Sequence, residues 1–364
     1  MRKIICLFFL IPFFINTGSA FALDNSFEDL ISSDELQSGL TANEKEIVGA
    51  PKLDGSYDWK NSLSRLYSRI VAMLSEKLKS ELGYGVKLAA LAMFCAVANC
   101  FCTDKKMSSC INIAACCAAA LMLAGDTDSI ISQAVDAMLQ LSDYSKAAMP
   151  AIFMAAAATG AVASSAAKYA ASSLVIDVLI STAVNYIVPL VNLYITISIT
   201  RSIFDNSILA AFSKFVKWAA TTFMTVMTMA FTAYIAFTGL ISGSTDMLAV
   251  KTTRTIIANG LPVVGKLISD ASSVILAGAN IVKNSAGVYS LIAVCTLCAS
   301  PFISLGIKML VFKAAASFAD MLPGSKLSGL INDIGTAFGM LLGLVGCCGI
   351  MLFISIISGI RVIT

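Results

Sequence analysis

The chain has 364 residues, of which 58% are hydrophobic and only 13% are charged, and its formal net charge is +3. Its mean hydropathy of +0.85 is too high for a soluble domain of this size. These values exclude a soluble enzyme and predict an all-α polytopic membrane protein, surrounded by membrane lipid, for which we expect no nucleic-acid partner.

The N-terminus has the three parts of a secretory signal peptide. A basic start precedes an apolar run over residues 4–15, and Ala20 and Ala22 form an A-x-A-like cleavage site. The run is shorter than the roughly 20 residues that a membrane-spanning helix needs. We therefore expect a signal peptide over residues 1–22 that is cleaved after Ala22, rather than an uncleaved anchor, and a mature N-terminus outside the cytoplasm.

Residues 23–84 form the soluble-looking part of the chain and hold half of its Asp and Glu residues. A capping-box pattern that begins at Thr41 predicts a short helix. A second helix over about residues 61–82, which Gly83 should end, has one apolar face: Leu63, Tyr67, Ile70, Leu74 and Leu78. A region this small cannot bury a sizeable core alone. We expect an acidic extracytoplasmic helical region that docks on the membrane or a partner, with a solvated arm as the alternative for residues 23–58.

About seven apolar stretches are long enough to span a membrane. They form a first group of membrane helices over residues 85–250 and a C-terminal group over residues 287–364. The predicted spans are approximately 86–102, 108–124, 145–165, 174–200, 218–241, 287–307 and 336–359.

The charges between these spans test the topology. With the N-terminus outside, the predicted loop that carries Asp126, Asp128, Asp136 and Asp143 falls outside, and most basic loops fall in the cytoplasm, as the positive-inside rule requires. Arg201, Lys214 and Lys217 fall outside and disagree with the rule.

Small and weakly polar residues recur at helical spacing inside the predicted spans. Close-packing faces are expected at Gly335, Gly339 and Gly343, and at Ala156, Gly160, Ser164 and Lys168. Polar faces are expected at Thr221, Thr225, Thr228 and Thr232, and at Ser181, Asn185, Asn192 and Thr196. These faces indicate helix packing or, alternatively, the lining of a conduit, and Asp177 is a candidate buried charge.

The stretch over residues 251–286 is neither an ordinary span nor an ordinary loop, because it combines charges with helix-breaking residues. The candidate assembly or conduit residues in and next to it are Lys251, Arg254, Pro262, Gly265, Lys266, Asp270, Lys283, Asn284 and Gly287. Lys266, Asp270 and Asn284 fall on one polar stripe of a helix that is otherwise apolar. The pattern predicts either an amphipathic helix at the membrane surface or a re-entrant element that faces water inside an assembly.

This stretch also resembles a known family. Lys251-Thr-Thr-Arg, Leu261-Pro-Val-Val-Gly, Ser269-Asp-Ala and Lys283-Asn-Ser-Ala-Gly-Val are similar to the hallmark segment of the stage III sporulation protein AE family, and the likeness continues through Phe312-Lys-Ala-Ala-Ala and Ile334-Gly-Thr-Ala-Phe. The resemblance implies a membrane component of the channel-like, secretion-like complex that links mother cell and forespore in endospore-forming bacteria, needed for forespore gene expression and development after engulfment. It carries no catalytic residues over to this chain.

The same resemblance implies partners and a location. The partners would be the other stage III sporulation A proteins, which are the AA ATPase and AB, AC, AD, AF, AG and AH, together with stage II sporulation protein Q. A self-oligomer is a further possibility that it leaves open. The location would be the mother-cell-derived membrane around the forespore, as a multi-pass protein of the cell membrane.

No enzyme chemistry is visible in the sequence. The chain has no His and no Gly-rich phosphate loop, so we expect neither catalysis nor a cofactor. Most of its 11 Cys lie in apolar stretches, and a soft-metal site at Cys100, Cys102 and Cys110 is a minor alternative. Beside a channel subunit, the open alternatives are a free-standing secondary transporter and a non-conducting membrane scaffold.

Overall fold

The computed structural model describes residues 36–52, 57–102, 104–159, 162–204, 206–240, 264–322 and 327–360, without the side chains of residues 105, 237–240 and 264–279. The predicted signal peptide with Ala20 and Ala22 lies outside these residues, as do Lys251, Arg254 and Pro262. The described chain is helical and contains no strand, so the protein is an all-α polytopic membrane protein.

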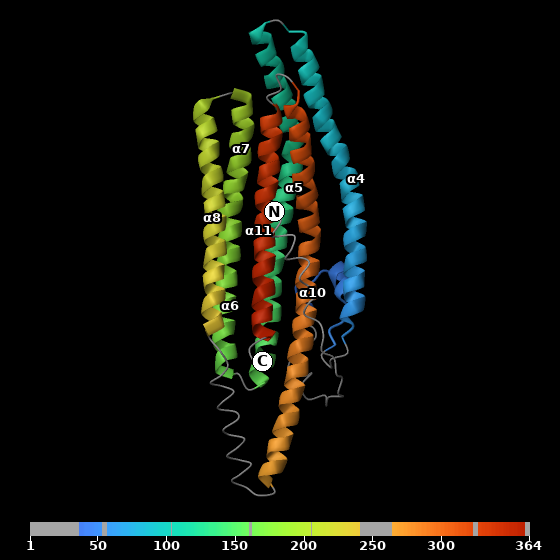
Figure 1. The fold of residues 1–364 in the computed structure, drawn as a ribbon, viewed down its shortest axis with the longest axis vertical. Helices are drawn as coiled ribbons and strands as arrows, with labels where there is room; N and C mark the ends of the chain where they lie inside the picture. Colours follow the sequence, from blue (N-terminus) through green and yellow to red (C-terminus); the bar gives the residue numbers. More distant parts are fainter. Residues whose placement is uncertain are drawn as a thin grey trace.

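The helices run along the long axis of an elongated bundle (Figure 1). In chain order they are α3 (Ala42–Val48), α4 (Trp59–Cys100), α5 (Lys105–Ala158), α6 (Val162–Thr182), the π-helical turn η3 (Ala183–Ile187), α7 (Val188–Phe204), α8 (Ser207–Leu240), α10 (Val264–Asp320) and α11 (Leu327–Ile360). Six described stretches are long and apolar enough to cross a membrane: Trp59–Cys100, Lys106–Ala158, Val162–Phe204, Ser207–Ala236, Asn280–Asp320 and Leu327–Ile360.

The described residues thus contain six such stretches, whereas the sequence predicted about seven spans. The predicted spans 108–124 and 145–165 are parts of one helix, because α5 continues through all four aspartates that were assigned to an external loop. One side of this segment is apolar and buried, including Ala134, Met138 and Leu141, and this burial keeps it helical. The alternation of loops predicted after it therefore does not hold.

The predicted end of a helix at Gly83 is also wrong. Helix α4 passes through Gly83 and continues to Cys100. A glycine ends a helix when it adopts positive φ, and among the described glycines only Gly39 and Gly49 do so. The apolar face predicted for this helix is largely exposed, with Leu63, Leu74 and Leu78 at 38 to 45%.

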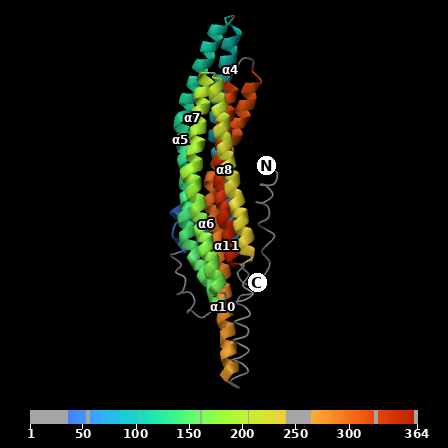
Figure 2. The same ribbon diagram turned by 90° about the vertical axis from the view of Figure 1, so that its left-hand side faces the viewer.

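The apolar halves of α4 and α5, residues 86–124, form a helical hairpin whose tip projects beyond the other helices (Figure 2). Polar side chains hold its two helices together. The amide of Asn99 donates to Asn112 Oδ1 at 3.1 Å, and the hydroxyl of Ser108 donates to Asn99 Oδ1 at 2.8 Å. Such interhelical hydrogen bonds stabilise the packing of two helices in an apolar environment.

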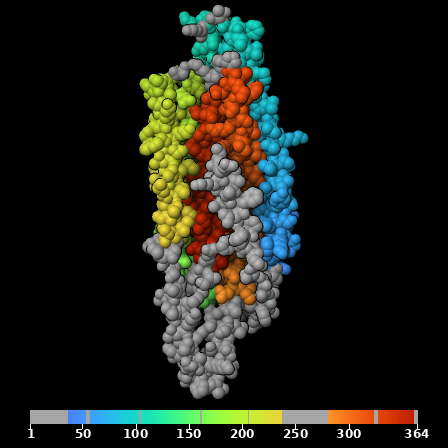
Figure 3. All heavy atoms as spheres, viewed as in Figure 1, coloured from blue at the N-terminus to red at the C-terminus, as the bar shows by residue number. Residues whose placement is uncertain are grey.

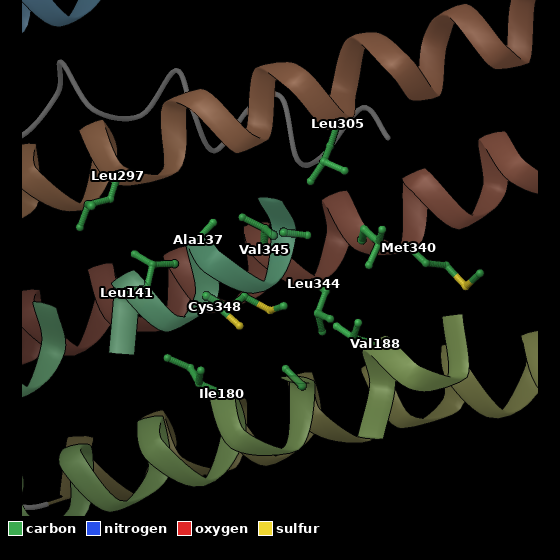
Figure 4. Close-up of a cluster of buried hydrophobic side chains, with 14 of the residues drawn as sticks. Ala137, Leu141, Ile180, Val188, Leu297, Leu305, Met340, Leu344, Val345 and Cys348 are labelled. Carbon is green, nitrogen blue, oxygen red and sulfur yellow. The ribbon is translucent and has the colours of Figure 1, made fainter. Parts of the chain in front are cut away.

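The core of the bundle is built around α11. Its residues Met340, Leu344, Val345 and Cys348 pack with side chains of three other helices (Figure 4). These side chains are Ala137 and Leu141 of α5, Ile180 of α6, and Leu297 and Leu305 of α10. The central position of α11 means that the other helices are arranged around its apolar stretch.

Glycines allow α10 and α11 to approach closely. A Cβ at Gly335 would lie 3.1 Å from Phe312 Cβ, and one at Gly339 would lie 3.2 Å from Met309 Sδ. The predicted glycine face is confirmed at these two positions, whereas Gly343 faces Met224 of α8. Beyond Gly339, the glycines that contact α10 are Gly346 and Gly349 rather than Gly343. Residues that contact a nearly antiparallel neighbouring helix recur about every 3.5 residues, so a strict spacing of four leaves the contact face.

The other small-residue and polar faces differ from expectation. Ala156 and Ser164 do not lie on one continuous helix, because α5 ends at Ala158 and α6 begins at Val162. The hydroxyls of Thr221, Thr225, Thr228 and Thr232 are exposed and each donates to a carbonyl four residues earlier. These threonines therefore satisfy their hydrogen bonds within α8.

A π-helical turn joins α6 to α7. The amide of Val188 donates to the carbonyl of Ala183, five residues earlier, and Pro189 follows directly. Proline has no N–H group and its ring clashes with the carbonyl four residues before it. The wider π turn relieves this clash and lets the span continue without a break.

The segment before α4 is tied down by a buried tyrosine. The Tyr57 hydroxyl donates to the carbonyl of Val48 at 2.7 Å and lies 3.1 Å from Ser62 Oγ, and its ring meets Tyr289 of α10 edge to face. Burial raises the pKa of Tyr57, so its hydroxyl stays a donor. The predicted capping box is present, since the Thr41 amide donates to the Glu44 carboxylate at 2.7 Å. These bonds fix α3 against α4.

Replacement of Gly335 by leucine should destabilise the bundle by about 1–3 kcal/mol, because the new side chain would press on Phe312 and on the Lys313 backbone. Thermal unfolding of the detergent-solubilised protein, followed by circular dichroism, measures this change. Gly125→Leu is the matched control, since no atom lies within 4 Å of a Cβ built there and leucine favours a helix more than glycine does. An equal loss for both variants would contradict the close packing at Gly335.

Candidate functional site

Contacts between helices fix which residues lie at the same height in the bundle. Gly339 meets Met309, and Gly349 meets Cys298, so residues 298–309 of α10 run beside residues 339–349 of α11. Residues 340–357 of α11 contain no charged side chain. This stretch is about 27 Å long, close to the roughly 30 Å of a membrane's hydrocarbon core. We infer from this length and composition that the bundle crosses the membrane at this height.

Helix α5 carries its aspartates at this height. Asp126 pairs with Lys308 of α10, and one groove is lined by both Gln140 of α5 and Leu297 of α10. Residues 126–143 of α5 therefore lie beside the stretch of α10 that packs on the apolar part of α11. Asp128, Asp136 and Asp143 are exposed there.

The lower half of α4 lies at the same height. The Glu81 carboxylate is 3.3 Å from the Lys308 ammonium, and the rings of Tyr57 and Tyr289 are 5.5 Å apart. The part of α4 between these contacts is charged, and its charged residues are Lys60, Arg65, Arg69, Glu76, Lys77 and Lys79. We call residues 62–81 of α4 and 126–143 of α5 together the polar flank.

The opposite side of the bundle has a different surface. Met224 and Thr228 of α8 contact Gly343 and Cys347 of α11, so residues 220–236 of α8 share the height of the polar flank. This part of α8 contains no charge, and it exposes large apolar side chains that include Phe223, Val226 and Met229. In Figure 3, α8 in yellow and α4 in blue border opposite sides of the bundle. The α8 side therefore suits lipid, whereas the polar flank does not.

A three-residue charge cluster closes the upper end of the polar flank. The Lys308 ammonium of α10 binds Glu81 of α4 and Asp126 of α5, and it lies 6.0 Å from the centre of the Tyr84 ring. The Lys308 side chain is 8% exposed, and Glu81 is 12% exposed. The Tyr84 hydroxyl donates to the carbonyl of Met122. One buried cation thus joins three helices, and removal of that cation would leave both carboxylates without compensation.

Below this cluster, a polar groove of about 480 Å³ runs between α5 and α10. The carboxylates of Asp136 and of Glu44 of α3 make the groove negatively charged. Its other lining residues are Ser129, Ser132, Gln133, Ala137, Gln140, Leu297, Ser300 and Pro301. Hydroxyl, amide and carboxylate groups at this height provide a path or a contact surface for polar groups where lipid would provide none.

Two further ion pairs connect neighbouring helices. Asp177 is 3.2 Å from Lys146, with both side chains about 60% exposed, so it is not the buried charge that the sequence indicated. Arg201 of α7 is 3.1 Å from Asp333 of α11, whose other oxygen accepts from the Tyr194 hydroxyl at 3.0 Å. This pairing neutralises Arg201, and its predicted conflict with the positive-inside rule no longer applies, because that prediction counted α5 as two spans.

The structure describes part of the predicted element at 251–286. Helix α10 begins at Val264 and continues without interruption into the predicted span at 287–307, so Gly265, Lys266 and Asp270 lie on its first turns, with their side chains outside the description. Gly287 lies against the Ile360 side chain, whose outer atoms would have to move if a Cβ were added there.

Lys283 and Asn284 of the same motif differ in environment. Asn284 is exposed, whereas Lys283 is 2% exposed and has no ion-pair or hydrogen-bond partner within the described part of the chain. The motif residues therefore do not come together into one polar surface, as far as their side chains are described. Nor do three Cys, Asp or Glu side chains in the described ranges lie close enough together to hold a metal ion, and this includes Cys100, Cys102 and Cys110.

Comparison with known proteins identifies the family. The sequence model of the family described as stage III sporulation protein AE matches residues 52–362. The chain belongs to the stage III sporulation protein AE family.

A curated relative supports this assignment. The stage III sporulation protein AE of Bacillus subtilis (strain 168) is 20% identical over 226 residues, which is 62% of this chain and 57% of that protein. The chain thus aligns with little more than half the length of this relative. No solved structure matches the chain. The family assignment and the six apolar helices make it a multi-pass membrane protein of a sporulation family.

Sequence reasoning missed the charge cluster of this family member. Glu81 was assigned to an external helix, Asp126 to a loop and Lys308 to the edge of a span, so nothing brought them together. One signal was available, because a lysine beside an apolar stretch such as 287–307 needs a counter-charge. Which carboxylates supply it depends on the heights of three helices, and only the structure gives these.

Replacement of Lys308 by methionine should destabilise this family member by about 3–5 kcal/mol, because Glu81 and Asp126 would lose the cation between them. Thermal unfolding in detergent measures the loss. The triple variant Lys308→Met, Glu81→Gln, Asp126→Asn should recover most of it. The control Lys146→Met removes an exposed pair and should cost no more than about 1 kcal/mol. No difference between Lys308→Met and the control would contradict the role of the cluster.

Proposed function

We propose that this chain is a non-enzymatic integral membrane subunit of the channel complex that links mother cell and forespore, and that forespore gene expression and development after engulfment depend on it. Family membership supports the link to sporulation. The observation that carries the role as a subunit is the polar flank, which places charges and a polar groove at the height of the apolar part of α11. Such a surface must meet water or another subunit.

The proposal assigns the two sides of the bundle to different neighbours. The uncharged, apolar surface of α8 over residues 220–236 faces lipid, and the polar flank faces the interior of the complex. There the groove beside Ser132 and Asp136 either lines part of a conduit or receives a neighbouring subunit. Both arrangements exclude lipid from the flank, and both leave the protein without a reaction to catalyse.

The partners in this proposal are the other stage III sporulation A proteins, with the AA ATPase as the energy-supplying component, and stage II sporulation protein Q from the forespore side. The protein would lie in the mother-cell-derived membrane around the forespore, with its mature N-terminus outside the cytoplasm. The motif residues Lys251, Arg254, Pro262, Gly265, Lys266 and Asp270 are proposed to serve assembly.

A non-conducting scaffold is the second candidate function, and one observation favours it. The polar groove is open on its side rather than enclosed by this chain, so a single copy does not form a closed path. A scaffold would use the same flank as a contact surface only. A free-standing transporter would use the helix break at residues 259–262, which lie outside the described residues, and the sequence shows no convincing internal repeat of the kind that transporters carry.

Filling the groove tests the proposed function. Ser132→Trp, introduced into the sporulating host in place of the native copy, should abolish forespore gene expression after engulfment, because the indole would occupy the space that a conduit or a partner needs. Fluorescence of a forespore-specific reporter measures the effect, and immunoblotting of membranes verifies that the variant accumulates. Val226→Trp on the lipid-facing side of α8 is the matched control and should behave as wild type. Normal forespore expression with Ser132→Trp would contradict the proposal.

A further inference from the structure

The exposed charges of the polar flank are mostly basic on α4, where Glu76 is the exception, and acidic on α5. Arg69 and Lys79 are exposed on α4, while Asp128, Asp136 and Asp143 are exposed on α5. Among the described residues, none of these five side chains forms an ion pair with another. Unpaired charges at membrane depth are costly unless an opposite charge or water meets them.

The positions of these charges along the bundle match. Glu81 and Asp126 share Lys308, so they lie at one height, and α4 and α5 run in opposite directions from that point. Lys79 is two residues before Glu81, and Asp128 is two residues after Asp126. At 1.5 Å per residue, the two side chains leave their helices at the same height.

The match extends further down the flank. Arg69 lies twelve residues before Glu81, and Asp136 lies ten residues after Asp126. The two positions therefore differ in height by about 3 Å, which long side chains span easily. Farther down, Arg65 and Asp143 match as well, although Arg65 also donates to the carbonyl of Glu46 at 2.8 Å.

The matched charges do not meet within one chain. Below the charge cluster, α10 packs against both α4 and α5, and Figure 1 shows α4 standing apart from α5 there. Helix α3 contributes Glu44 to the groove beside α5 and is bonded to α4 through Arg65. The body of the protein thus separates the two faces that carry complementary charges.

We propose that α4 of one copy packs along α5 of a second copy, with Arg69 against Asp136 and Lys79 against Asp128. All copies of a membrane protein share one orientation, so rotation about the membrane normal preserves every height. A second copy therefore presents its aspartates at the heights of the first copy's basic residues, as a cyclic assembly requires. The inference rests on the membrane placement proposed above and not on the role in sporulation.

Apolar contacts accompany these ion pairs. An exposed apolar stripe runs along α4 beside the basic residues: Leu63, Tyr67, Val71, Leu74, Leu78 and Leu82. On α5, Leu139 is 46% exposed between Asp136 and Asp143. Exposed ion pairs alone contribute little, whereas a stripe of this length buried against a neighbour supplies the packing, and the charges then set the register.

Charge reversal in the purified full-length chain tests the interface. Arg69→Glu with Lys79→Glu should weaken self-association by about tenfold or more, which is at least 1.4 kcal/mol, because like charges would then face each other. Asp128→Lys with Asp136→Lys should do the same. The variant that carries all four changes should associate as wild type does, since its pairs are restored with exchanged signs. Light scattering of the protein in detergent, across a dilution series, measures the distribution of masses.

Cross-linking shows whether the contact is between chains. Two differently tagged copies, one with Arg69→Cys and one with Asp136→Cys, should form a disulfide-linked species that carries both tags, above the level seen for two tagged wild-type copies. The control Lys214→Glu with Lys217→Glu, on exposed positions of α8, should leave association unchanged. A monomeric wild-type chain, a fourfold variant that does not recover, or no species with both tags would overturn the proposal. Loss of spore development would leave it intact, because that outcome concerns the function and not this contact.

Discussion

The cost of placing a charge in hydrocarbon is the constraint on which the rest of this structure depends. Residues 340–357 of α11 contain no charge, and they form the centre around which the other helices pack. Everything at their height must be apolar, paired or in contact with something other than lipid. Helix α8 meets this requirement because its residues 220–236 carry no charge, and α7 carries its Arg201 beyond this height, paired with Asp333. Helices α4 and α5 meet it only in part, and this incomplete neutralisation indicates a neighbour.

The contacts that assemble the bundle also determine its asymmetry. Glycines at 335, 339, 346 and 349 bring α10 against α11, and the resulting register places Lys308 beside Glu81 and Asp126. The cluster in turn sets the relative heights of α4 and α5. One buried cation thus links the core seam to the polar flank, and the matching of Lys79 with Asp128 follows from the same contact. The same contacts of Lys308 therefore stabilise the bundle and align the charges of the proposed interface.

Much of this architecture could be predicted from the sequence. Composition alone gave the fold class, and spacing gave the glycine contacts at Gly335 and Gly339 and the capping box at Thr41. The prediction failed where polar residues were taken as loops. Four aspartates suggested a turn between two spans, although Ala134, Met138 and Leu141 on the other side of the same segment fit a helix. Gly83 was taken as a helix end, because the sequence does not show whether a glycine adopts positive φ.

The site was less predictable than the fold. The sequence motif over 251–286 carries the family likeness and supplied the predicted site residues. The polar flank lies in segments without such a motif. The flank exists only through the relative heights of helices that are far apart in the chain, and periodicity within one helix contains no information about them. A buried lysine such as Lys308 shows that a counter-charge is needed, but not where it comes from.

Spin labels at two positions of equal height test the central claim most directly. Ser132 of the polar flank lines the groove with Pro301, next to the Phe302 that meets Gly346, and Val226 of α8 lies beside the contacts with Gly343 and Cys347. In bilayers, a label at Val226 should be accessible to oxygen and shielded from a water-soluble nickel complex. A label at Ser132 should be reached by the nickel complex or occluded from both reagents. A lipid-like result at Ser132, equal to that at Val226, would contradict the account.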